Sequence, residues 1–447
     1  MNVDSFRVRI VRVSISQLYG LYDHHIVLNR EERVTILHGP NGVGKSMLLR
    51  MVAAFFSGRY RDFTLVPFRD FTIALSDGSI VAIHWPDGGI GARQSATICV
   101  TISGPDTVRY ELPIVSAYEQ IATQIERSSA NVGRSSDGRF IDFRNGLWLT
   151  AEEVVDRFGS AEEASLARFV KSDDEPKEAR TLRSRVSVHY VETQRLLRSP
   201  DPLPRAEKKP MIATVRSYSD DIVRQISRTL TRYGTESQKL DQTFPQRLIG
   251  SQLPTVSPGH LKEKLGALDR RQSDLNSLGL IDKVSYQSLL PFQIDQLDDT
   301  KRSVMALYVA DTETKLSLLD DLSTRVRLLV QSVNGKFRNK TLGVSRERGL
   351  QIFDKYGTLV PLEFLSSGEQ HELVLWYDLL FKVESNSLVL IDEPELSLHV
   401  TWQKKFLPEL METARTVPFD TIIATHSPFI IGDRLDLTVP LDADVDQ

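Results

Sequence analysis

Short apolar runs alternate with polar positions near both ends of the chain. Residues 8–38 predict short strands, and residues 64–115 predict a β-meander with a hairpin turn at Asp77-Gly78. Residues 369–426 alternate between helical and strand-like patterns, as is typical of a parallel sheet covered by helices. The two ends therefore predict an α/β fold with a mixed β-lobe and a parallel sheet.

The middle of the chain follows a helical pattern instead. Prolines between positions 200 and 210 mark a linker, and residues 212–337 read as a helical insert. Two stretches carry apolar residues at spacings of three and four, one from Leu261 to Leu278 and one from Leu319 to Val333. We expect two amphipathic helices that pack on each other, because the insert is too short for a long intermolecular coiled-coil arm.

Composition narrows the class of protein. The chain has 447 residues, enough for two or three domains, and its net charge of −4 gives no global signal for nucleic acid. Cys99 is its only cysteine, which rules out an intrachain disulfide and fits a reducing compartment. No signal-peptide pattern and no apolar run of membrane length is present. We expect a cytoplasmic protein without a membrane span.

Residues 39–46, "GPNGVGKS", match the phosphate-loop pattern G-x-x-x-x-G-K-[ST]. The loop follows an apolar strand and opens a helix, as the motif requires, so a chance glycine-rich turn is a poor explanation. Its backbone N–H groups would wrap phosphates, Lys45 would reach the β- and γ-phosphates, and the Ser46 hydroxyl would bind Mg²⁺. The predicted nucleotide-binding residues are Gly39, Pro40, Asn41, Gly42, Val43, Gly44, Lys45 and Ser46.

Two further motifs end buried strands. Asp392 closes the apolar run "LVLI", at the end of the sheet where ligands bind in open α/β folds, and we expect it to hold Mg²⁺. Glu393 would act as the general base on the attacking water. His426 ends a second apolar strand and would contact the γ-phosphate or position that water. The alternatives are an acidic pair that caps a helix and a structural histidine.

The set "GPNGVGKS", "LSSGEQ", "LVLIDEPELSLH" and "THSP" resembles the ABC-type ATPase head of the SMC and RecF superfamily. This resemblance implies that ATP and Mg²⁺ are the cofactors. It also implies that two subunits pack head to tail, so that signature residues Ser366, Ser367 and Gly368 reach the ATP of the neighbour. Gln194 resembles the glutamine that joins metal and water, with Gln94 as a competitor. Tyr19 and Tyr22 are candidates for stacking on adenine.

The same resemblance divides the chain into three segments. Residues 1–199 would form an N-terminal ATPase lobe, residues 200–338 a helical insert, and residues 339–447 a C-terminal lobe with the signature, Asp-Glu and His motifs. A transporter motor is disfavoured, because such motors lack a large helical insert. An OLD-type nuclease would need a Toprim domain, and we expect none after His426.

Within this superfamily the context of the motifs resembles the AriA ATPase of two-gene PARIS anti-phage systems, and also PtuA of Septu. That resemblance implies a sensor and scaffold that assembles into a homo-oligomeric ring. Its partners would be a Toprim-like nuclease effector, AriB, and a phage-encoded trigger protein that releases it. The alternative is a RecF-like DNA-repair ATPase. Basic clusters at residues 180–185 and 205–210 could bind phosphates, although such clusters are more often solvated surface.

Overall fold

The computed structural model of the protein forms two compact units. Unit 1 comprises Met1–Thr193, Pro200–Pro210 and Val383–Gln447, and unit 2 comprises Gln194–Ser199 and Met211–Lys382. The structure describes residues 8–85, 97–104, 107–113, 117–129, 131–134, 140–143, 147–149, 151–160, 176–191, 197–198, 212–250, 256–282 and 294–441. Because these units follow spatial contacts rather than chain order, the division into three sequence segments stays a prediction.

A six-stranded antiparallel sheet forms one layer of unit 1, in the order β2-β1-β4-β5-β6-β7. The β-meander prediction is confirmed, and Gly78, with φ +85°, lies in the turn that joins β4 to β5. Alternate side chains of β4 point into the core, as one-sided burial requires. The strands are β1 (Ile10–Leu18), β2 (Tyr22–Val27), β4 (Asp70–Leu75), β5 (Ile80–His84), β6 (Thr97–Ser103) and β7 (Val108–Pro113).

A five-stranded parallel sheet forms the second layer of unit 1, in the order β11-β17-β18-β3-β19. Every residue of β17 and β18 is buried, which explains why these strands are continuous apolar runs instead of alternating patterns. The strands are β3 (Val34–His38), β11 (Val188–Val191), β17 (Leu388–Asp392), β18 (Asp420–Ala424) and β19 (Thr438–Pro440).

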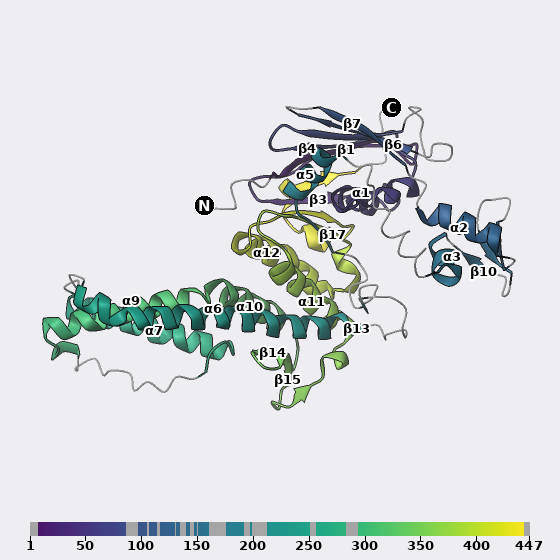
Figure 1. Ribbon diagram of the computed structural model, residues 1–447. Helices are drawn as coiled ribbons and strands as arrows, with labels where there is room; N and C mark the ends of the chain where they lie inside the picture. The colour runs from purple at the N-terminus through teal and green to yellow at the C-terminus, as the bar shows by residue number, and fades with distance from the viewer. Residues whose placement is uncertain are drawn as a thin grey trace. The chain divides into compact units, whose positions relative to one another are not determined.

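Helix α1 (Lys45–Ser57) joins the two layers (Figure 1). Its buried side chains, among them Leu48, Val52 and Phe55, belong to one apolar cluster with residues of both sheets. Helix α12 (Val400–Thr416) follows β17, and α5 (Lys177–Arg185) packs against α1. A mixed β-lobe and a parallel sheet with helical cover are the fold of an ABC-type ATPase head, so the predicted fold class is confirmed.

Residues 117–158 form a small module with its own core in unit 1. The polar sequence of residues 117–180 predicts a mostly helical segment, whereas the structure has a three-stranded sheet between two helices in its first part. Its strands are too short for a period of two to show. The elements are α2 (Ala117–Ser128), β8 (Val132–Arg134), β9 (Phe140–Asp142), β10 (Leu147–Leu149) and α3 (Ala151–Phe158).

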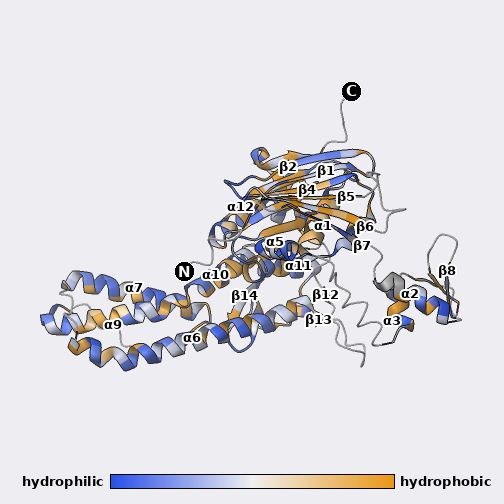
Figure 2. Cartoon of the chain, turned by 45° about the horizontal axis from the view of Figure 1, so that its top comes forward, coloured by the Kyte–Doolittle hydropathy of each residue, from blue (hydrophilic) through white to orange (hydrophobic). Residues whose placement is uncertain are grey.

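Unit 2 is built on long helices, which Figure 2 shows with hydrophobic and hydrophilic residues in both colours. They are α6 (Thr214–Gly250), α7 (Pro258–Ser277), α9 (Asp299–Ser317) and α10 (Asp320–Asn334). The expected pairing of the two leucine-rich helices needs correction, since α7 packs mainly on α9 while α10 packs on α11 and β14. Periodicity identifies the apolar face of a helix but not its neighbour.

The remainder of unit 2 leads into the signature stretch. A three-stranded antiparallel sheet, in the order β14-β15-β16, precedes a short 3₁₀ turn and helix α11 (Ser367–Tyr377), which continues as a π-helical turn over Asp378–Lys382. The strands are β14 (Lys340–Ser345), β15 (Gly349–Asp354) and β16 (Leu359–Val360). Among the described residues of both units, no helix is long and apolar enough to span a bilayer.

Candidate active site

The phosphate loop connects β3 to α1, as predicted, and its glycines are required sterically. A Cβ on Gly39 would lie 2.3 Å from the Leu441 carbonyl oxygen, and one on Gly44 would lie 2.2 Å from Leu18 Cδ2. Gly42 and Gly44 have φ values of +89° and +97°, in the left-handed region that glycine favours. The loop backbone therefore packs closely against other segments of the same chain. The turn that would face a phosphate carries no side chain at these glycines.

His24 is a loop contact that sequence reasoning missed. It is buried on β2, and its Nε2 lies 2.7 Å from the carbonyl oxygen of Val43. A carbonyl only accepts, so Nε2 carries the proton and donates to the loop. The alternating pattern of β2 placed this histidine on the buried face, but nothing in the local sequence indicated its partner.

Lys45 is almost fully buried, with 6% of its surface exposed. Its Nζ donates to the carbonyl oxygens of Gly39 and Pro40, at 2.8 Å each. Burial lowers the pKa of Lys45, while the nearby carboxylates of Glu393, Glu395 and Asp392 oppose that shift. The ammonium is held inside its own loop by neutral oxygens, which fits a group whose counter-charge is a bound phosphate.

Asp392 ends β17 next to the phosphate loop, where the sequence predicted it. Its Oδ1 accepts a hydrogen bond from Ser46 Oγ at 2.7 Å, which joins two residues 346 positions apart. Its Oδ2 accepts from the Tyr190 hydroxyl at 3.3 Å. Burial, together with the negative charge of Asp392, raises the pKa of Tyr190 to about 12, so the phenol stays a donor. A hydroxyl and a carboxylate oxygen are ligands that Mg²⁺ prefers.

Glu393 follows directly with a strained backbone. Its φ of +43° and ψ of +58° lie in the left-handed region, which costs a non-glycine residue roughly 1–2 kcal/mol. Its N–H donates to the Ala424 carbonyl oxygen of β18 at 2.9 Å, which fixes the turn. Strain of this kind concentrates at functional sites, because it persists only where the surroundings enforce it. The half-buried carboxylate lies one residue from the Asp392 ligand position.

His426 follows β18 and is oriented by Glu395. The buried Glu395 accepts hydrogen bonds at Oε1 from Thr425 Oγ1 at 2.8 Å and from the His426 N–H at 2.9 Å. His426 Nδ1 lies 3.1 Å from the same oxygen, which leaves Nε2 for a phosphate or a water. We did not assign Glu395 from sequence. Its position in "DEPE", next to a buried strand end, is the signal that was present.

The signature stretch lies in unit 2 and begins helix α11 with a capping box. The N-cap Ser366 accepts from the Glu369 N–H, and Glu369 Oε2 accepts from the Ser366 N–H at 2.8 Å. Lys340 Nζ donates to the same Glu369 oxygen at 2.8 Å. Ser366 and Ser367 are exposed, so this small-residue helix start presents a ready anion-binding surface. Glu369 is the residue here that we did not single out from sequence.

The remaining candidates divide in two groups. Gln194 and its competitor Gln94 lie outside the described residues. Tyr19 lies beside the phosphate loop, since a Cβ on Gly44 would be 3.5 Å from its Cε2, whereas Tyr22 stacks on His24 at 5.9 Å. Both tyrosines thus lie near the phosphate loop, Tyr19 beside Gly44 and Tyr22 through His24. Within the described part of the chain, no three His, Cys, Asp or Glu side chains group to hold a metal by themselves.

Comparisons with known proteins identify relatives that are described as AAA-domain or ATPase proteins. Residues 224–432, somewhat less than half of the chain, match a family model described as "AAA domain, putative AbiEii toxin, Type IV TA system". The "Retron Ec83 probable ATPase" of Escherichia coli is 26% identical over a region that covers 26% of this chain and 27% of that protein. The chain thus spans about a quarter of the length of this relative.

Solved SMC head domains align over nearly the whole chain at low scores. The head domain of Pyrococcus furiosus Smc bound to the C-terminal domain of ScpA is 12% identical, with a TM-score of 0.35, over 95% of this chain and 91% of that one. The SMC head of Thermotoga maritima gives 11% and 0.30 with the same coverage. Over residues 224–432 the chain therefore matches an AAA ATPase domain, and the geometry of its phosphate loop agrees with nucleotide binding.

Proposed function

We propose that this ATPase binds and hydrolyses MgATP at composite sites of a homo-oligomer, as the sensor and scaffold subunit of an anti-phage defence system. The observation that carries the ATP site is the Ser46–Asp392 hydrogen bond of 2.7 Å. It brings the end of the phosphate loop and the end of β17 together at the carboxyl edge of the parallel sheet, where such folds bind ligands.

The residues present fit MgATP. The loop N–H groups and the Lys45 ammonium would bind the phosphates, and Ser46 and Asp392 would hold Mg²⁺. When bound, the metal would neutralise charge on the phosphate oxygens. Glu393 would accept the proton of the attacking water, and His426 Nε2 would accept from that water or, in the protonated ring, donate to the phosphate. Glu395 orients this imidazole through Nδ1.

The hydrolysis step is tested by Glu393→Gln in the full chain. Loss of the general base should lower the rate of phosphate release by about a hundredfold or more, while the affinity for ATP stays unchanged. The ATP-bound assembly should therefore accumulate, as a mass measurement with ATP would show. Glu412→Gln, an exposed carboxylate on α12, is the matched control and should behave as the unchanged protein. Normal hydrolysis in Glu393→Gln would remove the base assignment.

The composite site rests on the exposed signature turn. Ser366, Ser367 and Gly368 have no nucleotide-binding partner of their own in the described part of unit 2, and the resemblance to SMC heads assigns them to the ATP of a neighbouring subunit. The N–H groups of a helix start suit a γ-phosphate. The oligomer is thus part of this proposal, because each ATP site would need two copies of the chain.

Ser366→Arg tests the composite site with the phosphate loop untouched. ATP binding should stay within about twofold of normal, while ATP-dependent pairing and hydrolysis should be lost because of the bulk and reach of the arginine. Ser366→Asn is the matched control, since asparagine keeps an N-cap acceptor without bulk or charge. Normal pairing and hydrolysis by Ser366→Arg would contradict the trans assignment; equal loss in Ser366→Asn would point to the cap instead.

The defence role is supported by the contexts "LSSGEQHELVLWYDLLF" and "THSPFIIGDRLDLTV", which resemble the AriA kind. The matched toxin–antitoxin family model and the retron ATPase relative support it independently. We propose that the oligomer holds a Toprim-like nuclease effector of the AriB kind inactive. A phage-encoded trigger protein would release it. A cytoplasmic location follows from this proposal.

A DNA-repair ATPase of the RecF kind is the second candidate, and its main support is the basic cluster at residues 180–185. Part of that cluster serves the fold of unit 1. Arg185 pairs with Asp77 at 3.0 Å, and Arg183 donates to the Phe56 carbonyl oxygen and lies over the Tyr60 ring. This use of two arginines favours the defence proposal.

The two candidates are separated by ATPase rates with and without duplex DNA at two salt concentrations. A repair ATPase should show strong, salt-sensitive stimulation by DNA, because phosphate contacts release counterions. A defence scaffold should show little stimulation and should co-purify with a Toprim-like nuclease encoded by the adjacent gene. Strong DNA stimulation without such a complex would overturn the defence proposal.

A further inference from the structure

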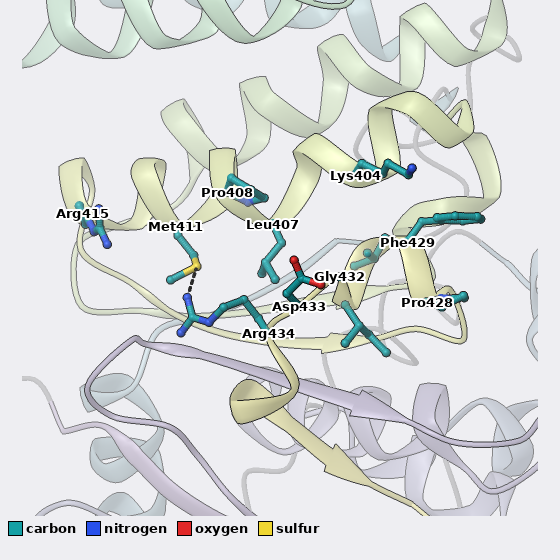
Figure 3. A pocket seen from close by; sticks show the side chains of 12 residues that line it. Lys404, Leu407, Pro408, Met411, Arg415, Pro428, Phe429, Gly432, Asp433 and Arg434 are labelled. Carbon is teal, nitrogen blue, oxygen red and sulfur yellow. Dashed lines mark hydrogen bonds between the residues drawn. The ribbon is translucent and has the colours of Figure 1, made fainter.

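A groove of about 690 Å³ lies in unit 1 between α12 and the short helix α13 (Pro428–Ile431) (Figure 3). Its lining is largely apolar and includes Leu407, Met411 and Ile430. Phe429 stands at its side and is 43% exposed. The proposed ATP chemistry uses none of these residues, so the groove is a separate surface feature of the fold.

The apolar lining is bordered by an unusual set of charges. Lys404 and Arg415 lie on α12 at the two ends of the groove, with Pro408 and Met411 between them (Figure 3). In the described part of the chain neither cation has an ion-pair partner, and Lys404 Nζ lies over the Phe429 ring, 5.4 Å from its centroid. Two cations without an ion-pair partner among the described residues therefore flank an exposed apolar surface, the kind of surface that a binding partner commonly covers.

The opposite wall carries a neutralised arginine and one carboxylate. Arg434 donates to Asp436 at 2.8 Å and to Glu32 at 3.2 Å, and these hydrogen bonds raise its pKa above the ordinary value. Asp433 lies between the two ends of the groove in Figure 3 and could accept one donor from an occupant. The groove therefore presents a cation, a central apolar and acidic stretch, and a second cation.

The spacing along α12 indicates what would match this arrangement. Positions 404, 408, 411 and 415 follow one face of the helix, and the two cations are eleven residues apart, or about 16 Å at 1.5 Å per residue. That length equals three helical turns and exceeds what one small anion covers. A groove of this kind, with apolar residues between two end charges, suits an amphipathic helix.

We propose that this groove is a docking site for an amphipathic helix of a partner protein. The helix would carry carboxylates eleven residues apart to meet Lys404 and Arg415. Apolar side chains four and seven residues after the first carboxylate would fill the space over Leu407 and Met411. This inference goes beyond the proposed ATPase function and does not depend on it.

The groove is also tied to the candidate active site through buried polar contacts. Ser427, the N-cap of α13, donates through Oγ to Gln403 Oε1 at 2.7 Å, and Gln403 Nε2 donates to the Leu398 carbonyl oxygen at 3.0 Å. Ser427 directly follows His426. An occupant that separates α13 from α12 would therefore act on the backbone that positions His426.

Binding of designed peptides to the full chain without nucleotide tests the docking site. The probe is a fluorescein-labelled helical peptide with two glutamates eleven residues apart and leucines four and seven residues after the first. Its control carries lysines in place of the two glutamates. In fluorescence anisotropy we expect the acidic peptide to bind about tenfold more tightly than the control, because its charges complement the groove.

The protein variant Lys404→Glu/Arg415→Glu should reverse this preference. The matched control Arg228→Glu/Arg232→Glu makes the same charge change at exposed positions of α6 and should leave the preference intact. Circular dichroism would verify that each variant folds. A milder variant, Lys404→Gln/Arg415→Gln, should abolish the preference for the acidic peptide without reversing it.

Four results would overturn the proposal, three of them from the peptide measurements. They are failure of the acidic peptide to bind, equal binding of both peptides, and a preference that Lys404→Glu/Arg415→Glu does not alter. A fall in the mass of the unliganded protein in this variant would also overturn it, since the groove would then join two copies of the chain.

Discussion

Buried lysines show how the two units use charge differently. In unit 2, Lys336 and Glu372 are both fully buried and form an ion pair, Trp376 Nε1 donates to the same Glu372 oxygen at 2.6 Å, and the ammonium lies 4.6 Å from the Trp376 ring centroid. In unit 1, Lys45 is nearly as buried, but its hydrogen bonds within the described residues go to neutral carbonyl oxygens. The charge of Lys336 is satisfied by direct contact within the fold, whereas the carboxylates near Lys45 act on it without forming an ion pair among the described residues, which leaves the ammonium available to a phosphate.

Two aspartates, the partly buried Asp221 and the buried Asp392, repeat the contrast. Asp221 in unit 2 accepts from Lys382, Tyr377 and Gln225 at 2.7–2.8 Å. Among the residues that the structure describes, Asp392 in unit 1 accepts hydrogen bonds from the hydroxyls of Ser46 and Tyr190 and forms no ion pair. A carboxylate with a fixed cation is a structural group, and one held by neutral hydroxyls keeps its charge available for a metal. The difference teaches that partners, and not burial, separate site charges from structural ones.

The largest expected loss of stability comes from breaking the buried Lys336–Glu372 ion pair of unit 2. Lys336→Met should destabilise unit 2 by about 3–5 kcal/mol, because Glu372 is left charged and unpaired in the core. Hydrogen exchange of the α11 amides would measure the loss. The double variant Lys336→Met/Glu372→Leu should recover most of it, since an apolar pair can replace a buried ion pair. A loss below about 1 kcal/mol in the single variant would mean that the pair does not support α11.

Asp221→Asn should have a smaller effect that depends on pH. Burial alone would raise the pKa of Asp221, but hydrogen bonds from Lys382, Tyr377 and Gln225 outweigh it and lower the pKa to about 2. The stabilisation is therefore present above the unfolded pKa of about 3.9 and is lost as pH falls through about 2. Asp221→Asn should remove about 2 kcal/mol at pH 7 and flatten this part of the pH dependence.

Urea unfolding between pH 5 and pH 2 would measure this contribution. Asp220→Asn is the matched control, because Asp220 is the neighbouring exposed carboxylate on α6 and should leave the profile unchanged. If both variants retain the same acid sensitivity as the unchanged chain, the network around Asp221 is not the structural element that the comparison assumes.

Much of unit 1 could be predicted from the sequence, because its strands and motifs are local. The apolar runs that became β17 and β18, and the loop that places Lys45, each follow from one contiguous pattern. Asp392 could be located because the end of a buried strand is visible in the sequence. Its contact with Tyr190 could not, since it depends on β11 pairing with β17 across about 200 residues.

The residues that orient the site were harder to find for the same reason. Glu395 accepts a hydrogen bond from the His426 N–H, 31 positions away. His24, on β2, donates to the Val43 carbonyl oxygen in the phosphate loop. The buried Lys336–Glu372 pair also has no local signature, because in the sequence its charges look like surface residues, one just beyond α10 and one on α11. Long-range partners of polar groups are set by packing, which a periodic pattern does not encode.

Lys45→Ala should have the smallest effect on stability and the clearest effect on binding. Burial already disfavours the charged ammonium, so removing it should change the stability of the unliganded chain by less than about 1 kcal/mol. The unchanged protein should gain about 2.7 kcal/mol when ATP is at about a hundred times its Kd, and Lys45→Ala should gain none. Thermal melts with and without MgATP would measure both quantities. If Lys45→Ala lowers the stability of the unliganded chain as much as Lys336→Met does, Lys45 is a structural charge. The contrast between Lys45, which we expect to bind a ligand, and the buried Lys336–Glu372 ion pair would then be wrong.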